Sequence, residues 1–176
     1  WINHLADRPT VYASMGTVQN RLLWVFREIA AACADLDVQL ILSLGGSASP
    51  DTLGDLPGTP IVVGNAPQLE LLPKATLTIT HAGMNTTLES LTYGVPMVAI
   101  PIANDQPAVA ARLAWTGAGA VIPLHKLTAE KLFEIESRAV EDVVAMQRAA
   151  GLEVCTDGEF HRRHWFMDFI ERIDGV

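Results

Sequence analysis

The sequence contains few cysteines, few basic residues and no long hydrophobic run. Its two cysteines, Cys33 and Cys155, lack the spacing of a metal-binding motif, and we interpret them as reduced thiols of a cytoplasmic protein. No apolar run reaches the roughly 20 residues that a membrane-spanning helix needs, and we find no signal-peptide pattern. The chain has 12 basic and 20 acidic residues, and its net charge of −8 argues against nucleic acid or an anionic membrane as the main partner.

The sequence does contain enough apolar material for one domain or slightly more. Of its 176 residues, 49% are hydrophobic, so a substantial core can form and extended disorder is disfavoured. The first residue is Trp1 rather than methionine, and we expect the chain to be a piece of a longer protein. The negative charge still allows an anionic small ligand, because backbone N–H groups at a helix N-terminus bind phosphate without a basic side chain.

Buried strands alternate with helices along the first part of the chain. Six apolar segments without polar alternation predict strands that are covered on both faces: 10–17, 38–46, 61–67, 76–83, 96–102 and 119–123. Helical patterns separate most of them: 21–37, 68–75, 84–94 and 105–117. This alternation predicts a Rossmann-like, doubly wound α/β fold, with a mainly parallel six-stranded sheet and helices on both faces.

The helix expected over residues 84–94 has an apolar spacing of three to four residues. That spacing directs Met84, Leu88 and Leu91 toward the core and places Gly94 at the C-terminal cap. Ligands of doubly wound sheets bind beyond the carboxyl ends of the strands. Small and polar residues collect at five such ends, which predicts a ligand site there: 14–17, 45–47, 64–68, 81–85 and 103–106.

The junction between the fourth strand and the following helix, residues 80–89, is the most informative motif. The first turn of a helix offers unpaired N–H groups and the positive end of the helix dipole. Gly83 removes a side chain that would block close approach, and Asn85 and Thr86 add neutral donors. His81 can add a hydrogen bond or a charge to the same phosphate. These residues predict a pyrophosphate cradle built without lysine.

Further residues extend this predicted site. Glu89, about one turn further, can accept hydrogen bonds from two vicinal ribose hydroxyls. Ser14, Gly16 and Thr17 follow the first strand and can supply the opposite wall. Each feature also has a purely structural interpretation: the small-residue turn can serve close packing, His81 can be a satisfied structural histidine, and Glu89 can lie on a solvated helix face.

The order of these pieces resembles a known signature. The stretch NAPQLELLPKATLTITHAGMNTTLESLTYGVPMVAIPIANDQ, residues 65–106, closely resembles the nucleotide-sugar donor motif of the UDP-dependent glycosyltransferases of GT-B fold. Among them it is most similar to bacterial enzymes related to zeaxanthin glucosyltransferase and macrolide glycosyltransferases. The resemblance covers about residues 1–125 and includes SMGT at the end of the first strand.

The resemblance implies that the chain binds the donor of an inverting glycosyl transfer, a nucleotide sugar of the UDP-glucose type. His81 would contact the donor diphosphate, with Gly83, Asn85 and Thr86 beside it, and Glu89 would hold the ribose. The UDP-sugar is a substrate; no cofactor and no metal are implied.

Other implied contacts come from separate loops. Gln68 would lie near the base and ribose, and Ser14 and Thr17 would face the phosphates. Asp105 and Gln106 would bind hydroxyls of the transferred sugar. The structural alternatives are that Asp105 is a helix N-terminal charge stabilised by the dipole and that Gln68 caps the short helix.

The chain departs from that family in two respects. Plant members carry a tryptophan that stacks on uracil where this chain has Asn65, which leaves the preference for UDP over dTDP open. The family's acceptor pocket and catalytic base belong to an N-terminal domain, and we interpret residues 1–9 as the interdomain linker. We find no residue here placed as the base. The full-length relative would glycosylate hydroxyls of a hydrophobic acceptor, whereas this chain should bind the donor, be inactive alone and tend to self-associate through the surface left exposed.

The C-terminal part differs in composition and in resemblance. Residues 1–123 carry 14 charged side chains and residues 124–176 carry 18. A helix–strand–helix pattern is predicted over 126–176, with Thr128 as the first N-cap. The stretches AGLEVCTDGEF and HWFMDF resemble cobalamin-independent methionine synthase-like proteins, which implies a chimera with its junction near 123–130.

In that second family, Asp157, Glu159 and Arg162 would lie near the substrate end of a barrel. His161, His164 and Cys155 can be considered as metal ligands, but no further ligand completes the set, and we expect no metal site. The main alternative to a donor-binding domain is therefore an engineered chimeric scaffold without ligand or activity. An active methyltransferase fragment would need zinc ligands that the sequence lacks.

Overall fold

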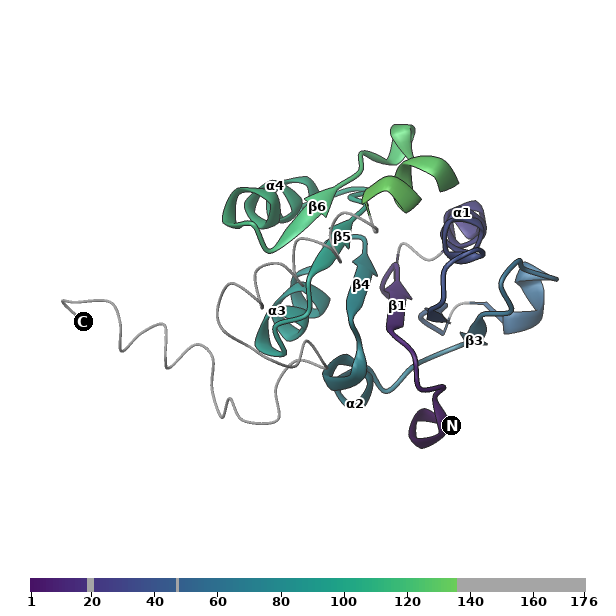
Figure 1. The fold of residues 1–176 in the computed structure, drawn as a ribbon. Coiled ribbons are helices and arrows are strands. Elements are labelled where there is room, and N and C mark those ends of the chain that lie inside the picture. Colours follow the sequence, from purple (N-terminus) through teal and green to yellow (C-terminus); the bar gives the residue numbers. More distant parts are fainter. Residues whose placement is uncertain (19–20, 47, 136–176) are drawn as a thin grey trace.

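A single parallel sheet organises the molecule (Figure 1). The computed structural model describes residues 1–18, 21–46 and 48–135. Within them the strands lie in the order β3-β2-β1-β4-β5-β6, and every neighbouring pair is parallel. The strands are β1 (Thr10–Ser14), β2 (Gln39–Ser43), β3 (Ile61–Val63), β4 (Leu77–Thr80), β5 (Met97–Ala99) and β6 (Gly119–Val121). The predicted doubly wound α/β fold is confirmed.

Each predicted helix of the first part is present, although its ends differ by a few residues. The α-helices are α1 (Leu23–Cys33), α2 (Gln68–Leu71), α3 (Met84–Thr92) and α4 (Gln106–Thr116). Short 3₁₀ turns complete the described elements: η1 (Ile2–His4), η2 (Pro50–Leu53), η3 (Leu72–Lys74) and η4 (Leu124–Lys126). The strands are shorter than predicted because their small polar ends leave the sheet and form the loops of the carboxyl edge.

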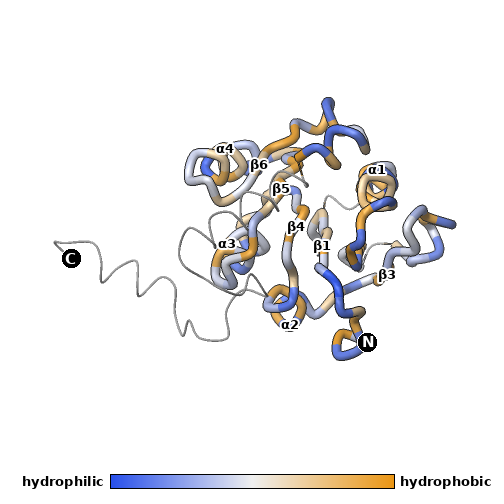
Figure 2. Tube along the Cα trace, viewed as in Figure 1, coloured by the Kyte–Doolittle hydropathy of each residue, from blue (hydrophilic) through white to orange (hydrophobic). Residues whose placement is uncertain are grey.

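Alternate side chains of the strands enter different layers of the core. Val11 and Ala13 of β1 belong to a cluster with α1 and with the segment 124–135, whereas Tyr12 packs with α2 and η3 on the other face. A third cluster joins β5 to α4. The helices combine hydrophobic and hydrophilic turns, as expected for elements that cover a sheet on one side (Figure 2).

The buried face of α3 is not the one that its apolar spacing predicts. Met84 and Leu88 were predicted to face the core, but they are 47% and 50% exposed. The buried residues are Thr86, Thr87 and Ser90. The reason lies in β4, which presents threonines on this face: the Ser90 hydroxyl donates to Thr78 Oγ1 at 3.4 Å. Small hydroxyl side chains therefore hold α3 against the sheet in place of an apolar stripe.

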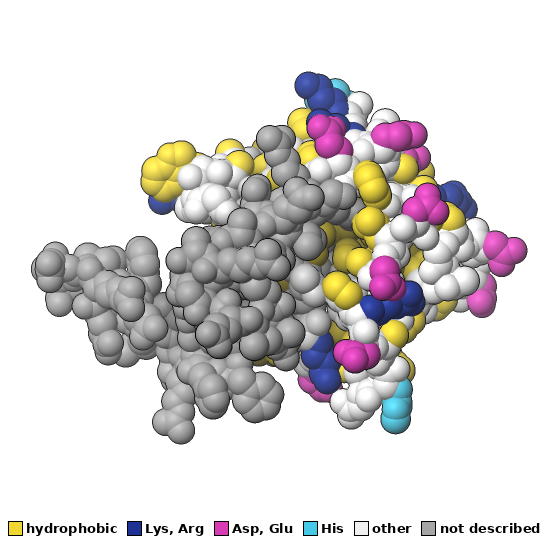
Figure 3. All heavy atoms as spheres, in the orientation of Figure 1, with side chains coloured by type: hydrophobic (Ala, Val, Ile, Leu, Met, Phe, Trp, Pro, Cys, Tyr) yellow, Lys and Arg dark blue, Asp and Glu magenta, His cyan; other side chains and the backbone are white. Residues whose placement is uncertain are grey.

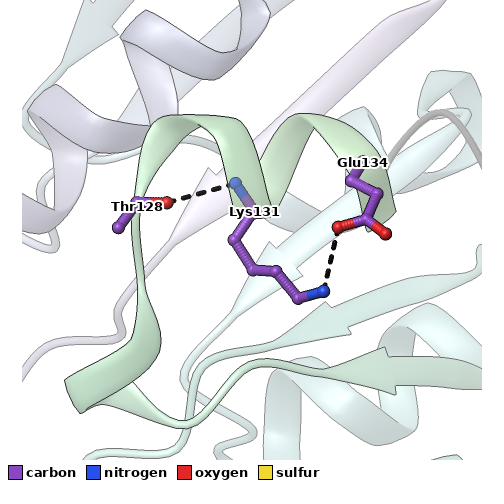
Figure 4. A network of polar contacts seen from close by, with 3 residues as sticks. All are labelled: Thr128, Lys131 and Glu134. Atoms are coloured by element: carbon purple, nitrogen blue, oxygen red, sulfur yellow. Dashed lines mark hydrogen bonds and ion pairs between the residues drawn. The ribbon is translucent and has the colours of Figure 1, made fainter.

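The segment after β6 packs against α1. A helix covers residues 129–135, and Thr128 caps it as predicted, since its Oγ1 accepts from the Lys131 backbone N–H at 3.2 Å (Figure 4). On the same helix, Lys131 Nζ lies 2.9 Å from Glu134, an exposed pair that contributes roughly 0.3–0.5 kcal/mol. The rest of the predicted 126–176 pattern, with its strand and second helix, lies outside the described residues.

A side chain of α1 fixes where this helix begins. The Glu28 carboxylate accepts the Ala129 backbone N–H at 2.7 Å, which satisfies a donor of the first turn. Leu132 then enters the α1 side of the core with 0% exposure. Residues about 100 positions apart in sequence are thereby joined in one layer.

The surface mixes charges of both signs. Among the described side chains visible in Figure 3, Asp and Glu are interspersed with Lys and Arg. Within the described part of the chain, no helix is long and apolar enough to cross a membrane.

Candidate functional site

A cleft of about 790 Å³ opens at the carboxyl edge of the sheet. It lies where the strand order reverses between β1 and β4, which is where doubly wound folds bind ligands. All the site residues proposed from the sequence line this one cleft: Ser14, Gly16, Thr17, Gln68, His81, Gly83, Asn85, Thr86, Glu89, Asp105 and Gln106. The structure thus brings them together, whereas their roles toward a donor stay predictions.

The His81 ring is wedged between two glycines. A Cβ atom at Gly83 would lie 2.5 Å from His81 Cε1 and Nε2, and one at Gly16 would lie 2.6 Å from Cε1. Both distances are too short for any side chain, and Gly16 also has a φ of +71°, which L side chains rarely adopt. The two glycines therefore allow the imidazole to keep the position that it has in this structure.

The backbone beside this histidine is strained. Ala82, between His81 and Gly83, has a φ of +64° although it is not glycine and is fully buried. Its N–H donates to Thr80 Oγ1 at 3.3 Å, which helps to hold the turn. Such a conformation costs on the order of 1–3 kcal/mol and is concentrated at functional sites. The strain identifies this turn as one that the surrounding structure holds in place.

The electrostatic surroundings keep His81 neutral. Burial lowers the pKa of His81 below its ordinary value of 6.5, and a backbone contact to Ser14 and the charge of Asp105 only partly oppose this. The imidazole is therefore uncharged at pH 7 and acts as a hydrogen-bonding group rather than as a cation.

The N-terminus of α3 opens into the same cleft. Gly83 is its N-cap, and no side chain among the described residues caps it. The residues of the first turn, Met84, Asn85 and Thr86, line the cleft. A turn of this kind offers unpaired N–H groups and partial positive charge, which suits an anion.

A relay of hydrogen bonds connects β1, α2 and α3 across the cleft. The Tyr12 hydroxyl donates to Gln68 Oε1 at 2.9 Å. Gln68 Nε2 donates to Glu89 Oε2 at 2.5 Å and lies 3.3 Å from Thr86 Oγ1. Gln68 is thus bound to the cleft wall, and the carboxylate of Glu89 is held by the amide.

No role was predicted from the sequence for Tyr12, which lies within an apolar strand. Tyr12 is 1% exposed, and burial raises the pKa of its hydroxyl, with Ser14 and Ser43 opposing the rise and Glu89 adding to it. Ser43, at the end of β2, also lines the cleft and accepts the Ala66 N–H at 3.3 Å. Both residues could have been predicted from their positions, because each is a polar side chain within or at the end of a buried strand at this edge.

Gln106 has a structural task at the start of α4. It is 4% exposed, and its Oε1 accepts the backbone N–H groups of Ile102 and Ala103 at 2.9 and 2.8 Å. Its Nε2 is the group that remains for a ligand. Asp105 is exposed at the N-cap of the same helix and makes no side-chain cap bond in the described structure.

The described cleft contains carboxylates but no lysine or arginine. Glu70, Glu89 and Asp105 line it, so an anionic ligand would have to be held by backbone N–H groups and neutral side chains. Within the described residues, no group of three or more His, Cys, Asp and Glu could hold a metal ion. The ligand candidates His161, His164 and Cys155 lie outside them, as do Asp157, Glu159 and Arg162.

Known proteins with this arrangement transfer sugars. The family model for UDP-glucoronosyl and UDP-glucosyl transferase matches residues 1–148. The zeaxanthin glucosyltransferase of Pantoea ananas is 38% identical over 116 residues, which are 65% of this chain and 27% of that protein. The solved structure of CalG4, the calicheamicin glycosyltransferase, superposes with a TM-score of 0.76 at 27% identity and covers 87% of this chain.

The comparisons give no evidence for a methionine synthase part. The family match continues to residue 148, past the junction expected near 123–130. The uncharacterized UDP-glucosyltransferase YdhE of Bacillus subtilis (strain 168) is 32% identical over 174 residues, or 98% of this chain. The change in charge density after residue 123 therefore does not mark a change of family. The matches around TDGE and HWFMDF, which suggested a second family, are short compared with the match to the first family.

The chain spans only part of each relative: 27% of the zeaxanthin enzyme, 43% of YdhE and 40% of CalG4. The family match itself covers most of the chain, and the sheet order and the cleft agree with it. The chain therefore belongs to the UDP-glucoronosyl and UDP-glucosyl transferase family.

Proposed function

We propose that the cleft binds a nucleoside diphosphate sugar of the UDP-glucose type, the donor of an inverting glycosyl transfer. The observation that carries the proposal is the uncapped N-terminus of α3, which opens into the cleft beside a neutral His81. A diphosphate there would receive backbone N–H bonds and the favourable end of the helix dipole. Membership of the family supports a nucleotide sugar as the source of that diphosphate.

The phosphates would lie between the ends of β1 and β4. His81 would donate one hydrogen bond, and Asn85 and Thr86 would add neutral donors from α3. Ser14 and Thr17 would face the phosphates from the β1 side. Because the described residues that line the cleft include no lysine or arginine, these neutral groups would carry their part of the interaction with the anion without a basic side chain.

The ribose and the sugar would extend along opposite directions from the phosphates. Glu89 and Gln68 would accept and donate hydrogen bonds to the ribose, and Asp105 would accept from hydroxyls of the sugar. Asn65 would lie beside the base. A Cβ at Gly46 would come within 2.8 Å of Asn65 Nδ2, so this amide packs closely on the neighbouring loop. An amide at this position offers hydrogen bonds in place of aromatic stacking, which favours no pyrimidine strongly.

Transfer itself would need residues beyond this chain. The site contains groups that bind a donor, and we assign none of them as the base that deprotonates an acceptor hydroxyl. One relative named above is a zeaxanthin glucosyltransferase, and we propose an acceptor hydroxyl on a hydrophobic molecule of that kind for the whole protein. The chain alone would bind the donor without turnover.

Isothermal titration of the full 176-residue chain with UDP, UDP-glucose and dTDP tests the proposal. Saturable binding is expected, and His81→Ala and Glu89→Ala should each weaken it about 10- to 100-fold, since each removes a hydrogen bond that involves a charged group. The matched controls His125→Ala and Asp55→Asn change exposed residues outside the cleft and should bind as the wild type does. A chain that unfolds cooperatively but binds no nucleotide would instead support the scaffold hypothesis.

A further inference from the structure

Tyr12 is a buried residue that reaches the candidate ribose site only through another side chain. Tyr12 belongs to the same core cluster as Ile41 and Leu71, and its hydroxyl donates to Gln68 Oε1 at 2.9 Å. Gln68 in turn donates to Glu89 Oε2. The three residues come from β1, α2 and α3, so the contact joins three elements that are far apart in sequence.

The orientation of the Gln68 amide follows from its neighbours. An ionised carboxylate only accepts hydrogen bonds, so the face toward Glu89 must be the NH₂ group. The carbonyl oxygen then points to Tyr12, whose hydroxyl has to donate. Thr86 Oγ1, at 3.3 Å from Nε2 and 3.4 Å from Oε1, can serve either end and does not select one. Glu89 at the NH₂ end and Tyr12 at the oxygen end therefore favour the same orientation of the amide.

The tyrosine is well suited to hold this orientation permanently. It is 1% exposed and its ring is surrounded by apolar side chains, so it cannot turn away. Burial and the nearby carboxylate both favour the protonated hydroxyl, which keeps it a donor. Without this donor, the half-buried Gln68 amide could rotate and release Glu89 Oε2.

We propose that Tyr12 is a positioning residue that, through Gln68, holds the Glu89 carboxylate in the orientation needed to recognise the 2′- and 3′-hydroxyls of the donor ribose. This inference rests on the proposed function, because it assigns the ribose to Glu89. With Oε2 held by the amide, Oε1 is presented to the ligand in one orientation. The relay would thereby select a ribonucleotide over its deoxy analogue.

The test compares ribose discrimination in matched tyrosine variants. Tyr12→Phe removes the hydroxyl and keeps the ring, and Tyr93→Phe is the control, because Tyr93 packs against the same cluster but does not line the cleft. The wild type and both variants are titrated calorimetrically with UDP and with 2′-deoxy-UDP. Wild type and Tyr93→Phe should prefer UDP by about tenfold or more, whereas Tyr12→Phe should reduce that preference to about twofold, mainly through weaker UDP binding.

A second variant tests the same hydrogen-bond relay at Gln68. Gln68→Leu breaks the same connection on α2, and it should lose the same discrimination. In that background Tyr12→Phe should have no further effect on the UDP to 2′-deoxy-UDP ratio, because the two groups act in series. This non-additivity is not expected from loss of core packing.

The outcomes separate the inference from the proposed function. If the wild type binds UDP and Tyr12→Phe weakens both nucleotides equally, or neither, the positioning role is wrong and the donor site stands. If the wild type binds neither nucleotide, the proposed function fails and the ribose role fails with it. A thermal unfolding curve for each variant verifies that the chains compared are folded.

Discussion

Replacing Gly83 with alanine should displace His81 without disturbing the backbone. Gly83 has a φ of −66°, which alanine adopts readily, so the change acts through its methyl group alone. That methyl would lie 2.5 Å from two atoms of the imidazole, and ordinary contacts are 3.4–4 Å. The ring must therefore move by about 1 Å, since the backbone on either side is held by the strained turn at Ala82.

The two consequences of this displacement differ in size. A half-buried ring can swing toward the cleft, so the stability cost should be only about 1–2 kcal/mol, from an altered rotamer and a poorer N-cap. For a chain of this length that lowers Tm by roughly 2–8 °C. If His81 binds the phosphate as proposed, UDP binding should weaken about 10- to 100-fold, because the displaced ring would no longer make that hydrogen bond.

Calorimetric titration and thermal unfolding of the wild type, the single variants and the double variant measure both effects. Gly64→Ala is the control, because a Cβ there meets no atom within 4 Å and Gly64 does not line the cleft. In a His81→Ala background, Gly83→Ala should weaken UDP binding no further. If it weakens binding by the same factor whether or not the imidazole is present, the wedged ring is not the cause and the reasoning is refuted.

The burial of His81 and the hydrogen bonds of Gln106 and Glu28 should each have a measurable effect on stability. Because burial lowers the pKa of His81, the unfolded chain binds more protons than the folded chain as pH falls below about 6.5. In denaturant titrations, the free energy of unfolding should be lower at pH 5.5 than at pH 7.5. The difference between the two pH values should be smaller for His81→Gln. Gln106→Leu leaves two loop N–H groups without their acceptor and should destabilise the fold by about 2–4 kcal/mol in urea, whereas Gln106→Glu, which keeps the acceptor, should cost less. Glu28→Ala removes the cap at Ala129 and should cost about 1 kcal/mol, with helical loss by circular dichroism; an unchanged midpoint would contradict the capping role.

The strands were predictable because their burial leaves a direct trace in the sequence. A strand covered on both faces is expected to be apolar, and the centres of β1 and β2 follow this pattern, whereas β4 alternates apolar residues with threonine. The inward face of α3 was not predictable by the same rule, since an apolar period presumes an apolar surface opposite it. The threonines of β4 make that surface polar, and only the pairing of β4 with α3 in space reveals it.

The residues of the candidate site were predictable from the sequence, but their bonding partners were not. These residues follow strand ends in sequence, and parallel topology brings those ends to one edge. Which atoms of these residues remain for a ligand was not predictable, because it depends on their hydrogen bonds within the protein. The side-chain oxygen of Gln106 accepts two loop N–H groups, and that of Gln68 accepts from Tyr12. Hydrogen-bond partners of this kind come from residues distant in sequence.

The central position of β1 has a consequence for how the chain folds. Its first neighbour, β2, follows soon after, but its second neighbour, β4, pairs Val11 with Leu77, a separation of 66 residues. Until residues 77–80 arrive, one edge of an entirely buried strand is open. Long-range parallel pairing of this kind is slow, and until it forms, the unpaired apolar strand edge can pair with other chains and cause aggregation. Refolding yield should therefore fall as protein concentration rises, even though, within the described residues, the edges of the finished sheet are the three-residue strands β3 and β6.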